Sequence, residues 1–261
     1  MSVKKTHFNG SFYPNSSDEV LEYIEYFNNR ILDEGINLQK YSAKSVIVPH
    51  AGYVYSGYTA NIAYKSISEF ENKRFILLGP SHHARFSGLC ISNDDVYPTP
   101  LGDVSIDTEY KQILEKEFDF VHLDIKEHST EVQVPFIKHY FPENKIIECV
   151  YSSYSATDLT TFVKFLLEDE NNILIVSTDL SHYYDISKAS SLDSKCIKAI
   201  QDLDLEALKD GCEACGVLGV YALIKNATNL NLTSKVLSYT TSADASGDNS
   251  NVVGYTSAII Y

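Results

Sequence analysis

Short apolar runs alternate with amphipathic stretches through the first two thirds of the chain. Four runs are rich in β-branched residues and apolar on both faces, which is typical of strands buried inside a sheet: residues 45–49, 74–78, 145–150 and 172–177. Between them, apolar positions recur with a helical period in residues 57–70, 108–118, 129–140 and 156–167. This alternation predicts an α/β fold in which helices flank a central, largely parallel or mixed sheet.

The pattern changes in the last third of the chain. Residues 187–202 and 215–224 have the period of helices, and the first of them interleaves acidic and basic side chains. Residues 233–241 and 251–261 alternate like the two strands of a hairpin around a turn-rich loop, residues 242–250. No repeat, linker or change in composition divides the sequence, so we expect a single domain over residues 1–261.

The charge of the chain limits its partners. Its 261 residues carry a formal net charge of −14, which repels nucleic acid phosphates and anionic membrane surfaces. No stretch reaches the roughly 18 apolar residues that a membrane span needs, and no apolar run follows the first lysines. We therefore expect a cytoplasmic protein without a nucleic acid or membrane partner.

The five cysteines are an odd number scattered along the chain, which predicts reduced thiols rather than a disulfide framework. Cys212 and Cys215 have the CxxC spacing of redox and zinc sites. Because no second CxxC and no histidine lies near them in the sequence, we interpret the pair as packing at the start of a helix.

Three of the four predicted core strands are followed by a histidine. His50 follows the first strand, His82 the second and His182 the fourth. Ligands of open α/β sheets bind beyond the carboxyl ends of the strands, so we expect these side chains to share one crevice. A single histidine at a strand end is more often a hydrogen-bonded loop residue, but three at one edge predict a metal or proton-transfer site. Asp179, three residues before His182, could orient it.

Other residues near these loops are predicted to have supporting roles. His83 directly follows His82 in an extended segment, so its side chain should point away from the crevice. His128 and Glu131 lie at a helix start that Ser129 would cap, and we expect them to brace the crevice rather than to bind a ligand. Gly79 allows a turn with positive φ before the second histidine. No GxSxG, GxxxxGK[ST] or GxGxxG motif supports a serine nucleophile or a nucleotide-binding loop.

With these residues in place, the chain resembles the Memo family, whose prokaryotic members are often called AmmeMemoRadiSam system protein B. The resemblance runs nearly end to end. It lies in motifs that occur in order: GSFYP at 10–14, PHAGY at 49–53, GPSHH at 79–83, EHSTEVQVPF at 127–136, STDLSH at 177–182, ACG at 214–216 and YTTSADASGDNSNVVGYTSA at 239–258.

The resemblance implies a fold similar to the extradiol ring-cleaving dioxygenases, in which two histidines and a carboxylate hold Fe(II) and leave positions open for substrate and O₂. By position, His50 and His82 would be the two histidine ligands. His182 would match the acid/base histidine of those enzymes, and Asp179 would be its partner or a second polar group in the pocket.

The third ligand departs from the family pattern. Animal Memo proteins use a cysteine of the C-terminal loop, and the matching position here is Ala245. The neighbouring Asp244 could supply a carboxylate and restore a set of two histidines and one carboxylate. Asp248, further along the same loop, is the alternative, and acidic residues also suit a solvated turn.

Two functions follow as hypotheses. The first is an oxidoreductase or dioxygenase-like protein that binds Fe(II), with copper or zinc as the other metals, and acts on an unknown small molecule. The second is a non-catalytic scaffold, derived from the dioxygenase fold, that binds a peptide or protein. The resemblance also implies partners from the AmmeMemoRadiSam system. The phosphotyrosine binding of animal members fits this acidic chain poorly, since Arg85 is the nearest arginine to the pocket loops.

Overall fold

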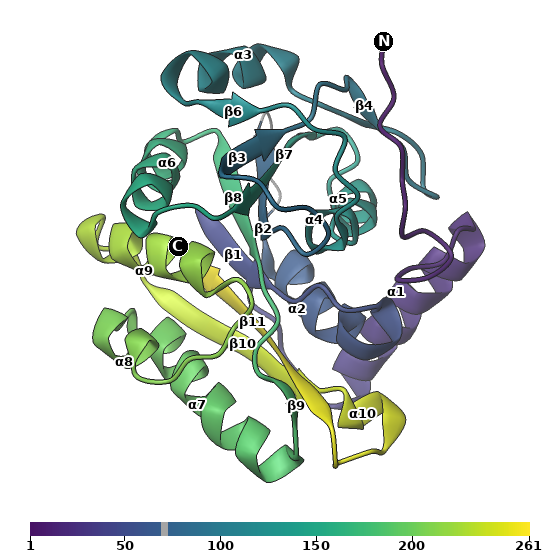
Figure 1. Ribbon diagram of the computed structural model, residues 1–261. Coiled ribbons are helices and arrows are strands. Elements are labelled where there is room, and N and C mark those ends of the chain that lie inside the picture. The colour runs from purple at the N-terminus through teal and green to yellow at the C-terminus, as the bar shows by residue number, and fades with distance from the viewer. Residues whose placement is uncertain (69–72) are drawn as a thin grey trace.

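A mixed β-sheet forms the centre of the molecule (Figure 1). The computed structural model describes residues 1–68 and 73–261, and within them nine strands form this sheet. Their order is β10-β11-β1-β8-β2-β7-β3-β6, with β9 paired to β11. The strands are β1 (Ser45–Val48), β2 (Arg74–Pro80), β3 (Gly88–Ile91), β6 (Phe120–Val121), β7 (Lys145–Ser152), β8 (Asn172–Ser177), β9 (His182–Tyr184), β10 (Ser234–Thr241) and β11 (Val252–Ile260). A small separate hairpin pairs β4 (Val96–Tyr97) with β5 (Val104–Ser105).

The four predicted core strands are confirmed as β1, β2, β7 and β8, which lie side by side and run parallel. Almost all their residues are buried, as expected for strands covered by helices on both faces. Antiparallel neighbours extend the sheet at both edges, where β3 pairs with β7 and β11 pairs with β1. The predicted hairpin at the end of the chain is confirmed as β10 and β11.

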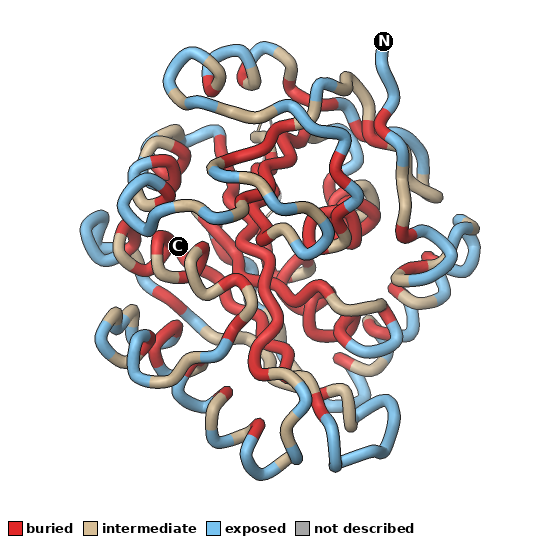
Figure 2. The backbone as a smooth tube through the Cα atoms, in the orientation of Figure 1, coloured by how far each residue is buried: buried red, intermediate tan, exposed pale blue. Residues whose placement is uncertain are grey.

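Helices cover both faces of the sheet (Figures 1 and 2). They are α1 (Ser17–Asp33), the π-helical turn η1 (Tyr53–Gly57), α2 (Tyr58–Ser66), α3 (Thr108–Glu117), α4 (His128–Glu131), α5 (Val134–Tyr140), α6 (Ala156–Glu168), α7 (Ile186–Asp202), α8 (Leu205–Lys209), α9 (Val217–Asn229) and α10 (Ala243–Ser246). One face carries α2 with α1 outside it, and the other carries α6 and α9. Among the residues that the structure describes, no helix is long and apolar enough to cross a membrane.

Some helices differ from the sequence-based expectation. The stretch 129–140 is divided into α4 and α5, because Pro135 lacks an N–H and is tolerated only in the first turn of a new helix. The prediction for 57–70 runs into residues 69–72, which lie outside the described residues. Helix α1 was not among the predicted elements, although its cap Ser16 and its buried Val20 and Ile24 are typical of an amphipathic helix.

The prediction of reduced thiols is wrong for one pair of cysteines. Cys196 of α7 and Cys212, which precedes α9, form a disulfide, while Cys90, Cys149 and Cys215 are free. The Cα atoms of the bonded pair lie 4.7 Å apart, within the range that a disulfide can bridge. Sequence spacing did not show this pair, because the chain folding between the two residues brings them together.

A buried ion pair ties the N-terminal segment to the sheet. Lys4 Nζ lies 2.7 Å from Glu148 Oε2 of β7, and both side chains are buried. Burial disfavours the charged form of Lys4, but the charge and hydrogen bond of Glu148, together with the charges of Asp94 and Asp124, raise the pKa of Lys4 above its ordinary value. Thr130 Oγ1 also donates to Glu148 Oε1, at 2.6 Å. The Tyr97 hydroxyl donates to the same oxygen at 3.4 Å, so the carboxylate depends on donors from three other segments.

Removing one partner of this pair should destabilise the protein. In Lys4→Met, Glu148 keeps a buried charge without its cation, so the free energy of unfolding should fall by about 3 kcal/mol. Urea denaturation measures the change, and Lys5→Met is the matched control because Lys5 is exposed. Equal losses of stability in the two variants would contradict this role of Lys4.

Candidate metal centre

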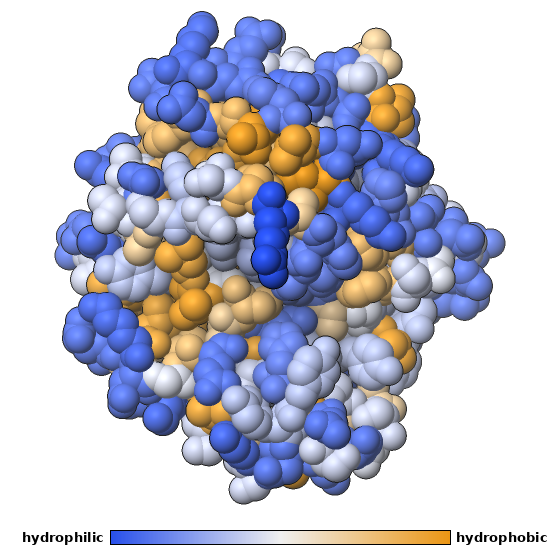
Figure 3. All heavy atoms as spheres, viewed as in Figure 1, coloured by the Kyte–Doolittle hydropathy of each residue, from blue (hydrophilic) through white to orange (hydrophobic). Residues whose placement is uncertain are grey.

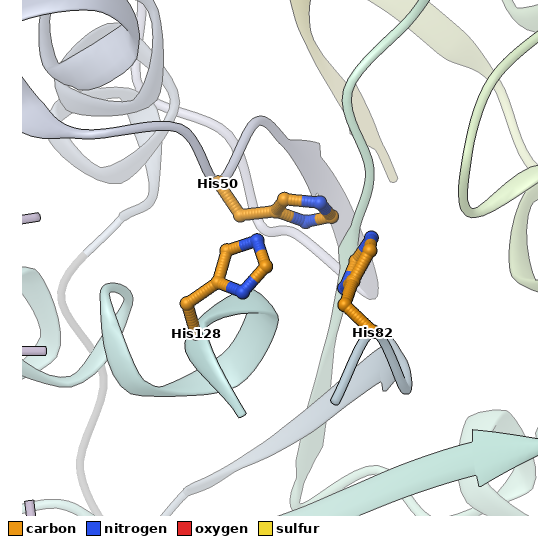
Figure 4. A group of neighbouring side chains, drawn as sticks. All are labelled: His50, His82 and His128. Carbon is orange, nitrogen blue, oxygen red and sulfur yellow. The ribbon is translucent and has the colours of Figure 1, made fainter. Parts of the chain in front are cut away.

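Three histidine rings meet at the carboxyl end of the parallel strands (Figure 4). His50 follows β1, His82 follows β2, and His128 is the first residue of α4. Their ring centroids are 5.1 Å apart for His50 and His82, 5.3 Å for His50 and His128, and 4.5 Å for His82 and His128. Each ring offers one nitrogen, and these three nitrogens lie within 4.8 Å of one another. We call these residues the histidine cluster.

The outcome for the predicted ligands is mixed. His50 and His82 were expected to lie together, and the structure brings them together. His128 was expected only to brace the crevice, but it lies in the cluster as a third potential ligand. Its position depends on how α4 packs against the end of β2, which spacing along the chain does not reveal.

His50 is buried, and hydrogen bonds hold both its ring and its main chain. Its Nδ1 lies 2.9 Å from Ser177 Oγ, and its backbone N–H donates to Asp179 Oδ1 at 2.7 Å. Burial, followed by the charge of His82, lowers the pKa of His50 to about 3. The ring is therefore neutral at ordinary pH and keeps a nitrogen lone pair, which a metal ligand requires.

The buried carboxylate of Glu127 orients His82. Its Oε2 accepts the backbone N–H of His82 at 2.5 Å, and its Oε1 lies 3.0 Å from His82 Nδ1. Burial opposes ionisation of Glu127, but hydrogen bonds from the His82 ring, the Ser129 N–H and the His82 N–H hold its pKa below the ordinary value. A carboxylate on Nδ1 leaves Nε2 of His82 as the nitrogen that can bind a metal.

The same carboxylate caps α4. Glu127 Oε1 accepts the Ser129 N–H at 3.0 Å, so Glu127 is the N-cap of this helix and the prediction that Ser129 is the cap is wrong. Glu131 has the predicted bracing role, because its carboxylate accepts the backbone N–H groups of His7 and Phe8.

His128 is enclosed by aromatic rings and polar neighbours. The Phe12 ring packs against it with centroids 4.7 Å apart, and its Nδ1 lies 3.2 Å from both Glu127 Oε1 and His83 Nε2. Burial, followed by the charge of His50, lowers the pKa of His128. His83 itself is exposed. Its Nε2 contacts Nδ1 of His128. A second group that could hold a metal consists of His83, Glu127 and His128.

Asp179 and His182 lie at the edge of the histidine cluster. The Asp179 carboxylate, expected to orient His182, instead accepts the backbone N–H of His50. Burial raises the pKa of Asp179 to about 6, and the hydrogen bond from the His50 N–H, followed by the charges of His182 and His82, acts against that rise. His182 begins β9, pairs with β11 and is half-buried. Asp179 therefore contacts the cluster through the main chain of His50, and the catalytic roles of Asp179 and His182 stay predictions.

Cys215 also contacts the cluster, a role that its place in the sequence did not predict. Its Sγ lies 3.3 Å from His50 Nε2 and accepts the Asp179 N–H at 3.2 Å. Burial, with the Asp179 charge, raises the pKa of Cys215 to about 12, so the group is a thiol. Gly216 allows this approach, since a Cβ there would lie 2.8 Å from the Ser177 carbonyl oxygen. The local signal was the ACG motif at 214–216, in which a glycine directly follows the cysteine.

The acidic residues of the C-terminal loop lie apart from the cluster. Asp244 is exposed on α10, and its Oδ2 accepts the Thr241 N–H at 2.7 Å. Asp248 is also exposed and accepts the Ser250 N–H. Neither carboxylate belongs to a potential metal-holding group within residues 1–68 and 73–261. Asp244 as a ligand stays a prediction.

Comparisons with known proteins point to one family. A family model described as Memo-like protein matches residues 4–259. The MEMO1 family protein of Nitrosopumilus maritimus is 32% identical over 268 residues, which cover 97% of this chain and 98% of the relative. A MEMO1 family protein of Methanococcus maripaludis is 37% identical over 276 residues, with 96% and 97% covered. One of Aquifex aeolicus is 33% identical over 273 residues, with 98% of each chain covered.

Gly79 lets α4 approach the end of β2. Its backbone is not left-handed, so the expected turn with positive φ is wrong. A Cβ at this position would instead overlap Ser129 Oγ and lie 3.0 Å from Ser129 Cβ. The glycine is therefore needed for close packing between the two elements that carry His82 and His128.

Gly79→Ala should push α4 away from β2 and lower the free energy of unfolding by about 2 kcal/mol. Urea denaturation tests this expectation. Because the shortest contact is with Ser129 Oγ, the double variant Gly79→Ala/Ser129→Ala should lose less than the sum of the two single variants. Strictly additive losses would show that the contact with Ser129 is not the cause.

Proposed function

The chain belongs to the Memo-like family, and on that premise we propose that it is a metal-dependent oxidoreductase, similar to dioxygenases, that acts on a small molecule. The observation that carries the proposal is the histidine cluster, in which nitrogens from three separate segments of the chain lie within 4.8 Å of one another. A protein that only bound a peptide would not need three imidazoles directed at one point.

The residues of the cluster fit a metal ion. Burial keeps His50 and His128 neutral, and Glu127 fixes the ring of His82. Three imidazoles suit iron, copper and zinc. We propose Fe(II), because the chain resembles iron dioxygenases, and copper or zinc are the alternatives. Bound there, the metal would supply open positions at which a substrate and O₂ can meet.

The surrounding residues would position the ligands and move protons. Ser177 holds Nδ1 of His50, and Glu127 holds Nδ1 of His82, which is the usual second contact of a metal-bound histidine. We assign proton transfer to His182, because an imidazole can both accept and donate a proton, with Asp179 as the adjacent carboxyl group. Phe12 packs against His128 and keeps water from that side of the cluster.

The third protein ligand is either His128 or Asp244. His128 is favoured because its ring already lies with the other two, whereas Asp244 is exposed and bonded to Thr241. Asp244 is the residue that the resemblance to two-histidine-one-carboxylate enzymes suggests. A variant of each residue separates these two assignments.

Metal analysis tests the site. After anaerobic reconstitution with Fe(II), wild-type protein should retain about one ion per chain, and His50→Ala and His82→Ala should lower the affinity by more than about 100-fold. His128→Ala should behave like them and Asp244→Ala like wild type. The control is His122→Ala, which removes an exposed histidine from another surface.

Two results are decisive. Wild-type metal content at background, or histidine variants that bind as well as wild type, would show that the site does not exist. Loss of metal in Asp244→Ala with retention in His128→Ala would assign the third ligand to Asp244.

Catalysis needs a separate measurement. Iron-loaded protein should consume O₂ with at least one member of a catechol panel, and His182→Gln should lower the turnover by about 10²-fold or more while metal content stays unchanged. An equal fall in metal content and turnover would make His182 a structural residue of the site. Silence across the panel with a filled metal site would support the peptide- or protein-binding scaffold instead.

A further inference from the structure

A groove with a volume of about 780 Å³ opens between the N-terminal loop, α1 and η1. In Figure 3, tan and pale side chains lie beside α1 on the side towards the middle of the molecule, among blue ones. Five of the groove's lining residues are aromatic: Phe12, Tyr13, Tyr23, Tyr26 and Tyr53. We call this feature the aromatic groove. Its volume lies in the range of small-molecule sites.

The aromatic walls are fixed by packing and by their hydroxyl groups. Tyr53 is buried, and its ring centroid lies 5.9 Å from that of Tyr13 and 6.3 Å from that of Tyr23. The Tyr53 hydroxyl donates to the Val132 carbonyl, and the Tyr13 hydroxyl donates to the buried Glu131 carboxylate. Because these two rings are almost fully buried, the aromatic surface open to a ligand comes from the exposed Tyr26 and the partly exposed Phe12 and Tyr23.

The charged side chains of the groove are acidic. Glu19 and Glu22 of α1 line it, and no lysine, arginine or histidine occurs among its described lining residues. Glu19 Oε2 accepts a hydrogen bond from Ser16 Oγ, and both glutamates are exposed. The formal net charge of −14 adds to the negative potential at this surface.

We propose that the aromatic groove binds a small organic cation of the alkylammonium or guanidinium class. Aromatic faces attract such cations through their quadrupoles, and the two carboxylates add a charge attraction that a neutral or anionic ligand lacks. The neighbouring Arg30 shows the same preference within the protein, since its guanidinium lies 3.9 Å from the centroid of the Tyr58 ring.

The proposal does not depend on the metal. None of the aromatic residues or glutamates of the groove belongs to the histidine cluster. The two features meet at Phe12, which lines the groove and packs against His128. A cation in the groove would therefore lie one aromatic ring away from the cluster.

The test uses benzyltrimethylammonium as the probe and full-length protein treated with a chelator. Calorimetry or NMR titration should detect its binding, with benzyl alcohol and benzoate at least about tenfold weaker. Glu22→Gln should weaken binding of the cation about fivefold. Tyr26→Leu should weaken it about threefold through loss of one aromatic face.

The matched control is Glu25→Gln, which removes the same charge from an exposed position of α1 that does not line the groove. Its affinity for the probe should equal that of wild type. If Glu22→Gln and Glu25→Gln weaken binding of the probe equally, the attraction comes from the overall charge of the protein and the proposed site is wrong. Equal binding of benzyl alcohol, or no binding of the cation, would overturn it as well. Because no metal is present, failure here leaves the proposed oxidoreductase function untouched.

Discussion

The buried carboxylate of Glu127 is the constraint on which the histidine cluster depends. An ionised carboxylate inside a protein must be met by donors, because an unpaired buried charge costs several kcal/mol. Here the donors are the main chain and ring of His82 and the N–H of Ser129. The end of β2 and the start of α4 cannot separate without removing donors from this buried charge. The positions of His82 and His128 follow from that requirement.

The order of the parallel strands supplies the other half of the cluster. Because β8 lies between β1 and β2, its terminal residues lie under both histidine loops. Ser177 contacts Nδ1 of His50, and the buried Gln133 donates to both Ser177 Oγ and the Pro49 carbonyl. Side chains of β8 and of the segment between α4 and α5 thus hold His50, much as Glu127 holds His82.

Burial separates two neighbouring environments. Inside, desolvation keeps His50 and His128 uncharged, so their nitrogen lone pairs are available to a metal ion. Outside, the aromatic groove presents rings and carboxylates to water, which suits an organic cation. Phe12 forms the boundary, since it lines the groove and its ring packs against His128. One aromatic side chain therefore separates the histidine cluster from the groove in which we propose that a cation binds.

The sequence by itself determined the four parallel strands and the positions of His50 and His82 at their ends, because strand patterns and the residues that follow them are local. Only the tertiary structure decided which distant residues join them. His128 entered the cluster through the packing of α4, and Cys215 reached His50 because Gly216 allows close contact with β8. The disulfide between Cys196 and Cys212 likewise joins residues that only the folded chain brings together. Such contacts depend on the path of the whole chain, and no periodicity or spacing encodes them.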